Sequence, residues 1–88
     1  MLKRKITITN SSGLHMRPAG VFAKTLMQFK SSVLFEVRGR EYIGKSMVSV
    51  LSAAVKCGDE IELHISGADA QECMDAIVAA IESGLGES

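Results

Sequence analysis

Residues 31–46, SSVLFEVRGREYIGKS, hold the most informative pattern of this chain. Apolar side chains stand at every second position from Val33 to Val37, which is typical of a strand with one buried face. Gly39 favours a turn, and residues 40–43 are typical of a short returning strand. We therefore expect an antiparallel hairpin, followed by a helix that has Ser46 as its N-cap and ends near Val55.

The segments before this hairpin predict a strand and a helix. Residues 5–9 alternate as a first strand, with Ile6 and Ile8 facing inward. A helix should begin near Met16 or Arg17, because proline at position 18 is tolerated in a first helical turn. Its apolar stripe has the spacing of a buried helix face and consists of Ala19, Phe22, Ala23 and Leu26.

The segments after the hairpin complete the fold. Residues 60–66 alternate as a fourth strand. Asp69 and Glu72 have the spacing of a capping box, so a last helix should begin there and end at Gly84. The element order is β-α-β-β-α-β-α, which predicts a single α+β domain over residues 1–88, with helices packed on one face of an antiparallel sheet.

Composition excludes several classes of protein. The apolar fraction of 47% is too high for disorder, and no apolar run approaches the ~18 residues of a membrane span. We therefore expect a cytoplasmic protein without membrane insertion. Cys57 and Cys73 form no CxxC pair and no zinc-ligand set, so neither a metal nor another cofactor is predicted.

The formal charge of zero is the sum of two unlike halves. Residues 1–56 carry all ten basic residues and two acidic ones, a net +8, and residues 57–88 carry the other eight acidic residues. Neutrality argues against direct nucleic-acid binding. An RNA-binding α+β domain is a weak alternative, because paired exposed aromatic residues are missing from the strands. We expect the basic half to face acidic protein partners and the acidic half to face away from them.

His15 is the first candidate for chemistry. It follows a glycine turn and directly precedes a helix, whose first N–H groups and partial positive charge favour a neutral imidazole. The same N–H groups would hold a phosphoryl group placed on the ring, and Arg17 would add a charge-assisted contact. An exposed loop histidine without a role is an equally open reading at this point.

Residues 39–46 also match the nucleotide-binding pattern GxxxxGK[ST]. Tyr42 and Ile43 favour a strand where a phosphate cradle needs open backbone, no later strand ends in a magnesium-binding Asp, and the chain is too short for the required parallel sheet. The hairpin reading is favoured. Ser46 is then an N-cap, at which a phosphate would gain from the helix dipole, and a plain capping role is compatible with this.

An apolar surface for transient protein docking is the third candidate. Its residues lie either outside the buried stripe of the first helix or on the second helix, which is apolar almost all round. They are Met16, Val21, Met27, Met47, Val48 and Leu51, and their neighbours are Arg17, Gly20, Lys24 and Lys45. A core position is the alternative for Met47 and Leu51. His64, on the polar face of its strand with Glu60 and Glu62, fits a solvated face better than a weak metal site.

The segment Gly13-Leu14-His15-Met16-Arg17-Pro18-Ala19 resembles the GLHARPA signature of the HPr family, the histidine-containing phosphocarriers of the sugar phosphotransferase system. Gly44-Lys45-Ser46-Met47 resembles the second, serine-bearing site of that family, and the likeness extends over the whole chain. It implies an open-faced β-sandwich with four antiparallel strands and three helices on one face. It also implies a phosphocarrier and not an enzyme.

The resemblance implies roles for three residues. His15 would accept a phosphoryl group on its δ nitrogen from phosphorylated Enzyme I and pass it to EIIA proteins, with Arg17 balancing the charge. Ser46 would be the site of HPr kinase/phosphorylase, and phosphoserine there would favour a catabolite repressor as partner. Met16 and Gly20 depart from the family pattern, which leaves open a regulatory paralogue that acts mainly through Ser46.

Overall fold

One antiparallel sheet of four strands, in the order β1-β4-β2-β3, forms the base of the computed structural model, which describes residues 1–87. The strands are β1 (Leu2–Thr7), β2 (Ser32–Val37), β3 (Arg40–Ile43) and β4 (Glu60–Ser66). The predicted hairpin is confirmed, because Val37 pairs with Arg40 across the turn at Gly39. The two central strands, β4 and β2, lie between the edge strands β1 and β3.

The first strand begins earlier than its alternating pattern predicts. β1 starts at Leu2, and Lys3 and Lys5 lie opposite His64 and Glu62 of β4. The strand ends at Thr7 and not at Thr9, but Ile8 is still buried in the core, and its N–H donates to the carbonyl of Asp59 at 2.9 Å. The basic residues therefore belong to the strand because the neighbouring strand offers them acidic and polar partners.

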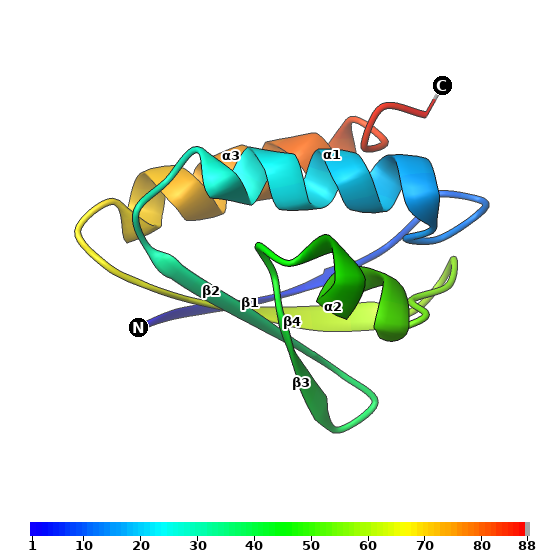
Figure 1. Ribbon diagram of the computed structural model, residues 1–88, viewed down its shortest axis with the longest axis horizontal. Coiled ribbons are helices and arrows are strands. Elements are labelled where there is room, and N and C mark those ends of the chain that lie inside the picture. Colours follow the sequence, from blue (N-terminus) through cyan, green and yellow to red (C-terminus); the bar gives the residue numbers. More distant parts are fainter. Residues whose placement is uncertain (88) are drawn as a thin grey trace.

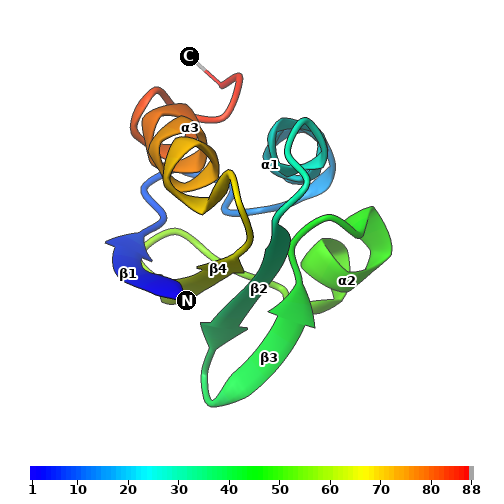
Figure 2. The same ribbon diagram turned by 90° about the vertical axis from the view of Figure 1, so that its left-hand side faces the viewer.

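Three helices, α1 (Met16–Met27), α2 (Met47–Ser52) and α3 (Ala70–Glu82), complete the predicted order. α1 and α3 lie side by side over the sheet, and α2 lies beside β3 (Figures 1 and 2). The core contains Phe22 of α1, Val50 of α2 and Ile77 of α3, so all three helices pack on the same face. Phe22 meets the ring of Phe35 edge to face at a centroid distance of 5.5 Å. The predicted fold is confirmed.

The second helix is shorter than predicted, ending at Ser52 and not near Val55. Ala54 has a left-handed backbone, with φ of 50°, which ends the helix. The guanidinium of Arg38 donates to the carbonyl of Ala53 and pairs with Asp59 at 2.6 Å, so a side chain from the hairpin satisfies the helix end. The apolar run in the sequence could not predict where the helix ends, because the side chain that satisfies its last carbonyl comes from another element.

The predicted capping box at the start of α3 does not form. Asp69 occupies the N-cap position without a side-chain capping bond. Its carboxylate instead accepts from the backbone N–H of Lys30 and of Ser31, each at 2.9 Å, and from the Ser31 hydroxyl. These bonds, the one from the Ser31 hydroxyl first, hold the pKa of Asp69 below its usual value. Asp69 therefore ties α3 to the loop that follows α1.

The open face of the sheet differs from expectation in two ways. His64 was predicted to be solvated, but it is only 8% exposed and its Nε2 lies 2.7 Å from Glu62, with Glu41 3.5 Å from Nδ1. Acidic and basic side chains also alternate here, with Lys5 opposite Glu62. The two oppositely charged halves of the chain are thus interleaved on this face, because antiparallel pairing places β1 next to β4.

Other sequence predictions concern metals and membranes. Within residues 1–87 no group of three or more His, Cys, Asp or Glu side chains is arranged to hold a metal ion. Both cysteines are free, with Cys57 exposed and Cys73 buried. Burial raises the pKa of the Cys73 thiol. None of the described helices has the length and apolar character needed to span a membrane.

Candidate functional site

His15 stands at the exposed N-cap position of α1. Its backbone is extended, its side chain makes no capping bond, and its carbonyl accepts from the N–H of Ala19 at 2.8 Å. Pro18 has no N–H, and no acidic residue lies in the first turn. Within the described chain no partner is recorded for the N–H of Met16 or Arg17. These two N–H groups and the helix dipole therefore favour an anion beside the imidazole.

The loop that carries His15 is fixed by a close backbone contact. Gly13 has φ of 65°, and a Cβ there would lie 2.2 Å from the carbonyl oxygen of Val55. The N–H of Leu14 donates to that same carbonyl at 2.9 Å, and the Leu14 side chain is buried. Only glycine fits at position 13, so the histidine loop is held against the segment that follows α2.

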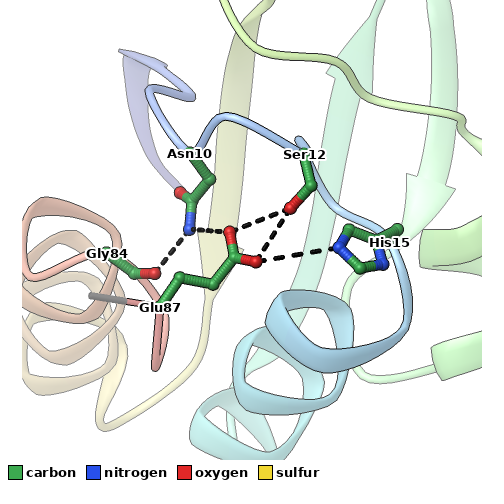
Figure 3. A network of polar contacts seen from close by, with 5 residues as sticks. All are labelled: Asn10, Ser12, His15, Gly84 and Glu87. Carbon is green, nitrogen blue, oxygen red and sulfur yellow. Dashed lines mark hydrogen bonds and ion pairs between the residues drawn. The ribbon is translucent and has the colours of Figure 1, made fainter.

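Glu87, near the other end of the chain, reaches this loop. Its carboxylate accepts from the Ser12 hydroxyl at 2.8 and 2.9 Å and from the Asn10 amide at 3.2 Å, and one oxygen lies 3.7 Å from Nε2 of His15 (Figure 3). The pKa of Glu87 is held below its usual value, mainly by the bond from Ser12 and then by that from Asn10, and Arg17 adds a nearby positive charge. The expectation that acidic residues face away from the site is therefore wrong for Glu87.

A buried leucine anchors the turn that carries Glu87. Leu85 is completely buried, and the Asn10 amide also donates to the carbonyl of Gly84. Positive φ angles at residues 84–86 fold the chain back after α3. Sequence reasoning did not identify Glu87 as part of the site. The pattern Gly84-Leu85-Gly86 indicates a turn, but no local signal tells where that turn docks.

Ser46 caps α2 as predicted. Its hydroxyl accepts from the N–H of Ser49 at 3.2 Å, and its carbonyl accepts from Val50 at 2.9 Å. The hydroxyl of Ser49 in turn accepts from the N–H of Ile43 at 2.8 Å, which joins α2 to β3. Ser46 is half-buried. The hydroxyl thus lies at the start of α2, next to the exposed side chains of that helix.

The nucleotide-binding reading of residues 39–46 does not fit this structure. β3 occupies residues 40–43, where a phosphate cradle would need open backbone. A Cβ at Gly44 would lie 2.8 Å from both Leu26 and Val33, so this glycine serves packing. The ammonium of Lys45 donates to the carbonyl of Phe29 at 2.6 Å. These residues build a hairpin and its contact with α1.

The RNA-binding reading loses its basis as well. Phe22 and Phe35 are buried, and Phe29 and Tyr42 are half-buried. The ring of Tyr42 stacks on Phe35 at a centroid distance of 5.5 Å. Within the described residues no Phe or Tyr side chain is therefore exposed for base stacking.

The predicted apolar surface is present on α1 and α2, which we call the docking surface. Val48 is 79% exposed, Met16 65% and Met27 64%, whereas Val21 and Leu51 are half-buried. Met47 packs over α1, its Cε lying 3.8 Å from the position of a Cβ at Gly20. Lys24 is exposed on the same helix. The surface thus combines exposed apolar groups with nearby positive charge.

Comparisons with known proteins agree with this arrangement. Residues 2–83 match the family model described as the PTS HPr component phosphorylation site. The phosphocarrier protein HPr of Neisseria meningitidis serogroup A is 39% identical over 87 residues, which cover 99% of this chain and 98% of the relative. The HPr-like protein Crh of Bacillus subtilis is 32% identical over 82 residues, 93% of this chain and 96% of the relative. The crystal structure of HPr-C-His from Thermoanaerobacter tengcongensis superposes with a TM-score of 0.96 at 35% identity, covering 100% of this chain and 99% of that one. The resemblance seen in residues 13–19 is confirmed, and this chain belongs to the HPr family of phosphocarrier proteins.

Proposed function

We propose that this chain carries a phosphoryl group on His15, which it accepts from phosphorylated Enzyme I and passes to EIIA proteins. The observation that supports this most strongly is the exposed imidazole at an uncapped helix N-terminus with no acidic residue in the first turn. A nitrogen nucleophile in this position can be reached by a partner protein. The proposed partners would place the chain in the cytoplasm.

The surroundings of His15 suit a transient phosphoryl group. The N–H groups of Met16 and Arg17 point along the start of α1, where an anion is stabilised by about 0.3–1 kcal/mol from the helix dipole alone. The guanidinium of Arg17 adds a charge-assisted donor for phosphoryl oxygens. Because the side chain of His15 is 54% exposed, the bound group would stay accessible to the next acceptor.

Incubation with phosphoenolpyruvate and Enzyme I tests the carrier role directly. We expect one acid-labile phosphate on the wild type and none on His15→Ala. The chain has only two histidines, so His64→Gln is the matched control and should keep the phosphate. A wild type that takes up no phosphate, or a His15→Ala variant that does, would refute the proposal.

The docking surface is proposed to receive Enzyme I and the EIIA proteins through apolar contacts and the charges of Arg17 and Lys24. Val48→Asp should weaken docking without unfolding the chain, because this side chain is 79% exposed. Ala79→Asp adds the same charge on the exposed side of α3 and serves as control. Equal rates of phosphorylation by Enzyme I for the two variants would contradict this placement.

Ser46 is proposed as a regulatory phosphorylation site for HPr kinase/phosphorylase, with a catabolite repressor as a further partner. A phosphoserine carries about −1.5 to −2 charges, here beside Met47 and Val48 of the docking surface. Incubation with the kinase and ATP should label the wild type and not Ser46→Ala, with Ser52→Ala as control. Label on Ser46 together with failure to accept phosphate from Enzyme I would identify a regulatory paralogue, a role that the similarity to Crh keeps in view.

A further inference from the structure

The carboxylate of Glu87 is held in place before any ligand arrives. Ser12 donates to both of its oxygens and Asn10 to one of them, while Leu85 fastens the preceding turn in the core. The oxygen that lies 3.7 Å from His15 therefore belongs to a fixed group. The imidazole is the less constrained partner, because its side chain is 54% exposed and makes no capping bond.

The contact distinguishes the two ring nitrogens of His15. Glu87 approaches Nε2, whereas Nδ1 faces away from the carboxylate (Figure 3). A carboxylate only accepts hydrogen bonds, so it favours the tautomer that carries the proton on the nearer nitrogen. In that tautomer the lone pair of Nδ1 is free. At 3.7 Å the present contact is an ion-pair distance, and a small rotation of the ring would bring Nε2–H into hydrogen-bond range.

We propose that Glu87 is a positioning residue for phosphoryl transfer, which holds the proton of His15 on Nε2 and directs the chemistry to Nδ1. The inference rests on the proposed carrier function and adds to it. In metal and triad sites the same device, a carboxylate or carbonyl on one nitrogen, sets which nitrogen of a histidine reacts. Here the carboxylate comes from the C-terminal turn.

The proposed step balances without any proton transfer. The Nδ1 lone pair forms the bond to phosphorus while the bond between phosphorus and the phosphorylated donor protein breaks, and the donor atom keeps that electron pair. Nε2 retains its proton, so the ring gains a positive charge beside the Glu87 carboxylate. In the onward step a nucleophilic atom of the acceptor EIIA protein forms a bond to phosphorus with its own lone pair, while the Nδ1–P bond breaks and Nδ1 recovers its electron pair. The ring then leaves as neutral imidazole, a far better leaving group than the anion that loss of the Nε2 proton would produce.

The negative charge of Glu87 repels a phosphoryl group on His15, but the position of the carboxylate keeps this repulsion small. A carboxylate near a phosphoryl group is repulsive, but this one lies on the Nε2 side of the ring, and the phosphoryl group would be on the opposite nitrogen. Arg17 and the free N–H groups at the start of α1 supply the compensating positive potential. The arrangement therefore places a negative group where the ring becomes positive.

The tautomer of His15 can be measured in the full chain labelled with ¹⁵N, at a pH where the imidazole is neutral. We expect the Nε2–H form to predominate, and the ratio of Nε2–H to Nδ1–H to fall about two- to five-fold in Glu87→Gln, the size of an exposed ion pair. Glu87→Asp should recover part of the ratio. Glu82→Gln, on the exposed side of α3, is the matched control and should leave the ratio unchanged.

A second measurement follows transfer from phosphorylated His15 to an EIIA domain as a function of pH. Transfer should decline at a lower pH in Glu87→Gln than in the wild type or Glu82→Gln, because the Nε2 proton is lost more easily. Ser12→Ala, which keeps the charge and removes its main hydrogen-bond donor, should lie between them. Identical tautomer ratios and pH profiles for Glu87→Gln and Glu82→Gln would overturn the proposal. The tautomer measurement needs no phosphoryl donor, so a wild type that takes no phosphate refutes the proposed function without changing this result.

Discussion

Truncation of Leu85 tests whether the C-terminal turn is held by the core. Leu85 is completely buried although its backbone has φ of 51°. Alanine is disfavoured at positive φ much as leucine is, so Leu85→Ala leaves the backbone cost in place and removes buried side-chain volume only. Such a change costs about 2–5 kcal/mol in a core that does not collapse. Because residues 83–86 form a turn, which can close part of the cavity more readily than a helix or strand, we expect the lower part of this range, about 2–3 kcal/mol.

Urea unfolding followed by far-ultraviolet circular dichroism measures this loss. With a slope of about 1–3 kcal/mol per molar urea, the midpoint should fall by roughly 0.7–3 M. The loosened turn should also release Glu87, so the amide signals of Ser12 and His15 should shift in NMR spectra. Val33→Ala truncates a buried residue of β2 and is the control, expected to lower stability while leaving those two signals in place.

Two results would refute this reasoning. A loss below about 0.5 kcal/mol in Leu85→Ala would mean that the turn contributes little to the core, in conflict with complete burial of the side chain. A full loss of stability with unchanged Ser12 and His15 signals would mean that the turn does not position Glu87.

Three further predictions concern the stability of the fold. Ser46→Ala should lower stability by about 1 kcal/mol in urea unfolding, through loss of the N-cap, whereas an unchanged midpoint would contradict the capping role. The pKa of Asp69 is lowered in the folded chain from the 3.8 of an unperturbed carboxyl, so the ionised carboxylate contributes fully to folding stability above about pH 4, and this contribution is lost as the pH falls further. The stability of Asp69→Asn should therefore decline less in an acid titration than that of the wild type. Gly44→Ala should cost about 1–3 kcal/mol by overpacking against α1 and β2, whereas Gly20→Ala meets only ordinary contact and should be neutral or stabilise α1 by up to ~1 kcal/mol, as thermal unfolding of both variants would show.

Periodicity predicted the parts of the fold that each depend on one buried face. The apolar stripe from Ala19 to Leu26 identified α1, and the alternation in residues 33–37 and 60–66 identified the two central strands. An element with one buried face has apolar residues at the period of that element, and this period is visible in the sequence. His15 and Ser46 were found for a related reason. Each lies at a helix start, which local sequence signals well.

Features that depend on contacts between distant segments could not be predicted in this way. The carbonyl at the end of α2 is satisfied by Arg38 from the hairpin, and Asp69 binds the loop after α1 and does not cap its own helix. His64 is covered although its strand position looked solvated, because Glu62 and Glu41 close over it. Glu87 belongs to the same group, since only the tertiary fold brings residue 87 to residue 15.

The two candidate phosphorylation sites are held by the same packing contacts, which join the α2 region to α1 and the histidine loop. The segment after α2 holds Gly13 and so fixes the histidine loop, and Met47 at the start of α2 packs over Gly20 of the helix that His15 begins. The start of α2 and the segment that follows it therefore contact α1 and the histidine loop, and such packed contacts resist small displacements. A phosphate on Ser46 would consequently act less by moving His15 than by adding negative charge to the docking surface that both sites border. A phosphate at this proposed regulatory site would then repel an acidic partner before transfer begins and leave the geometry at His15 unchanged.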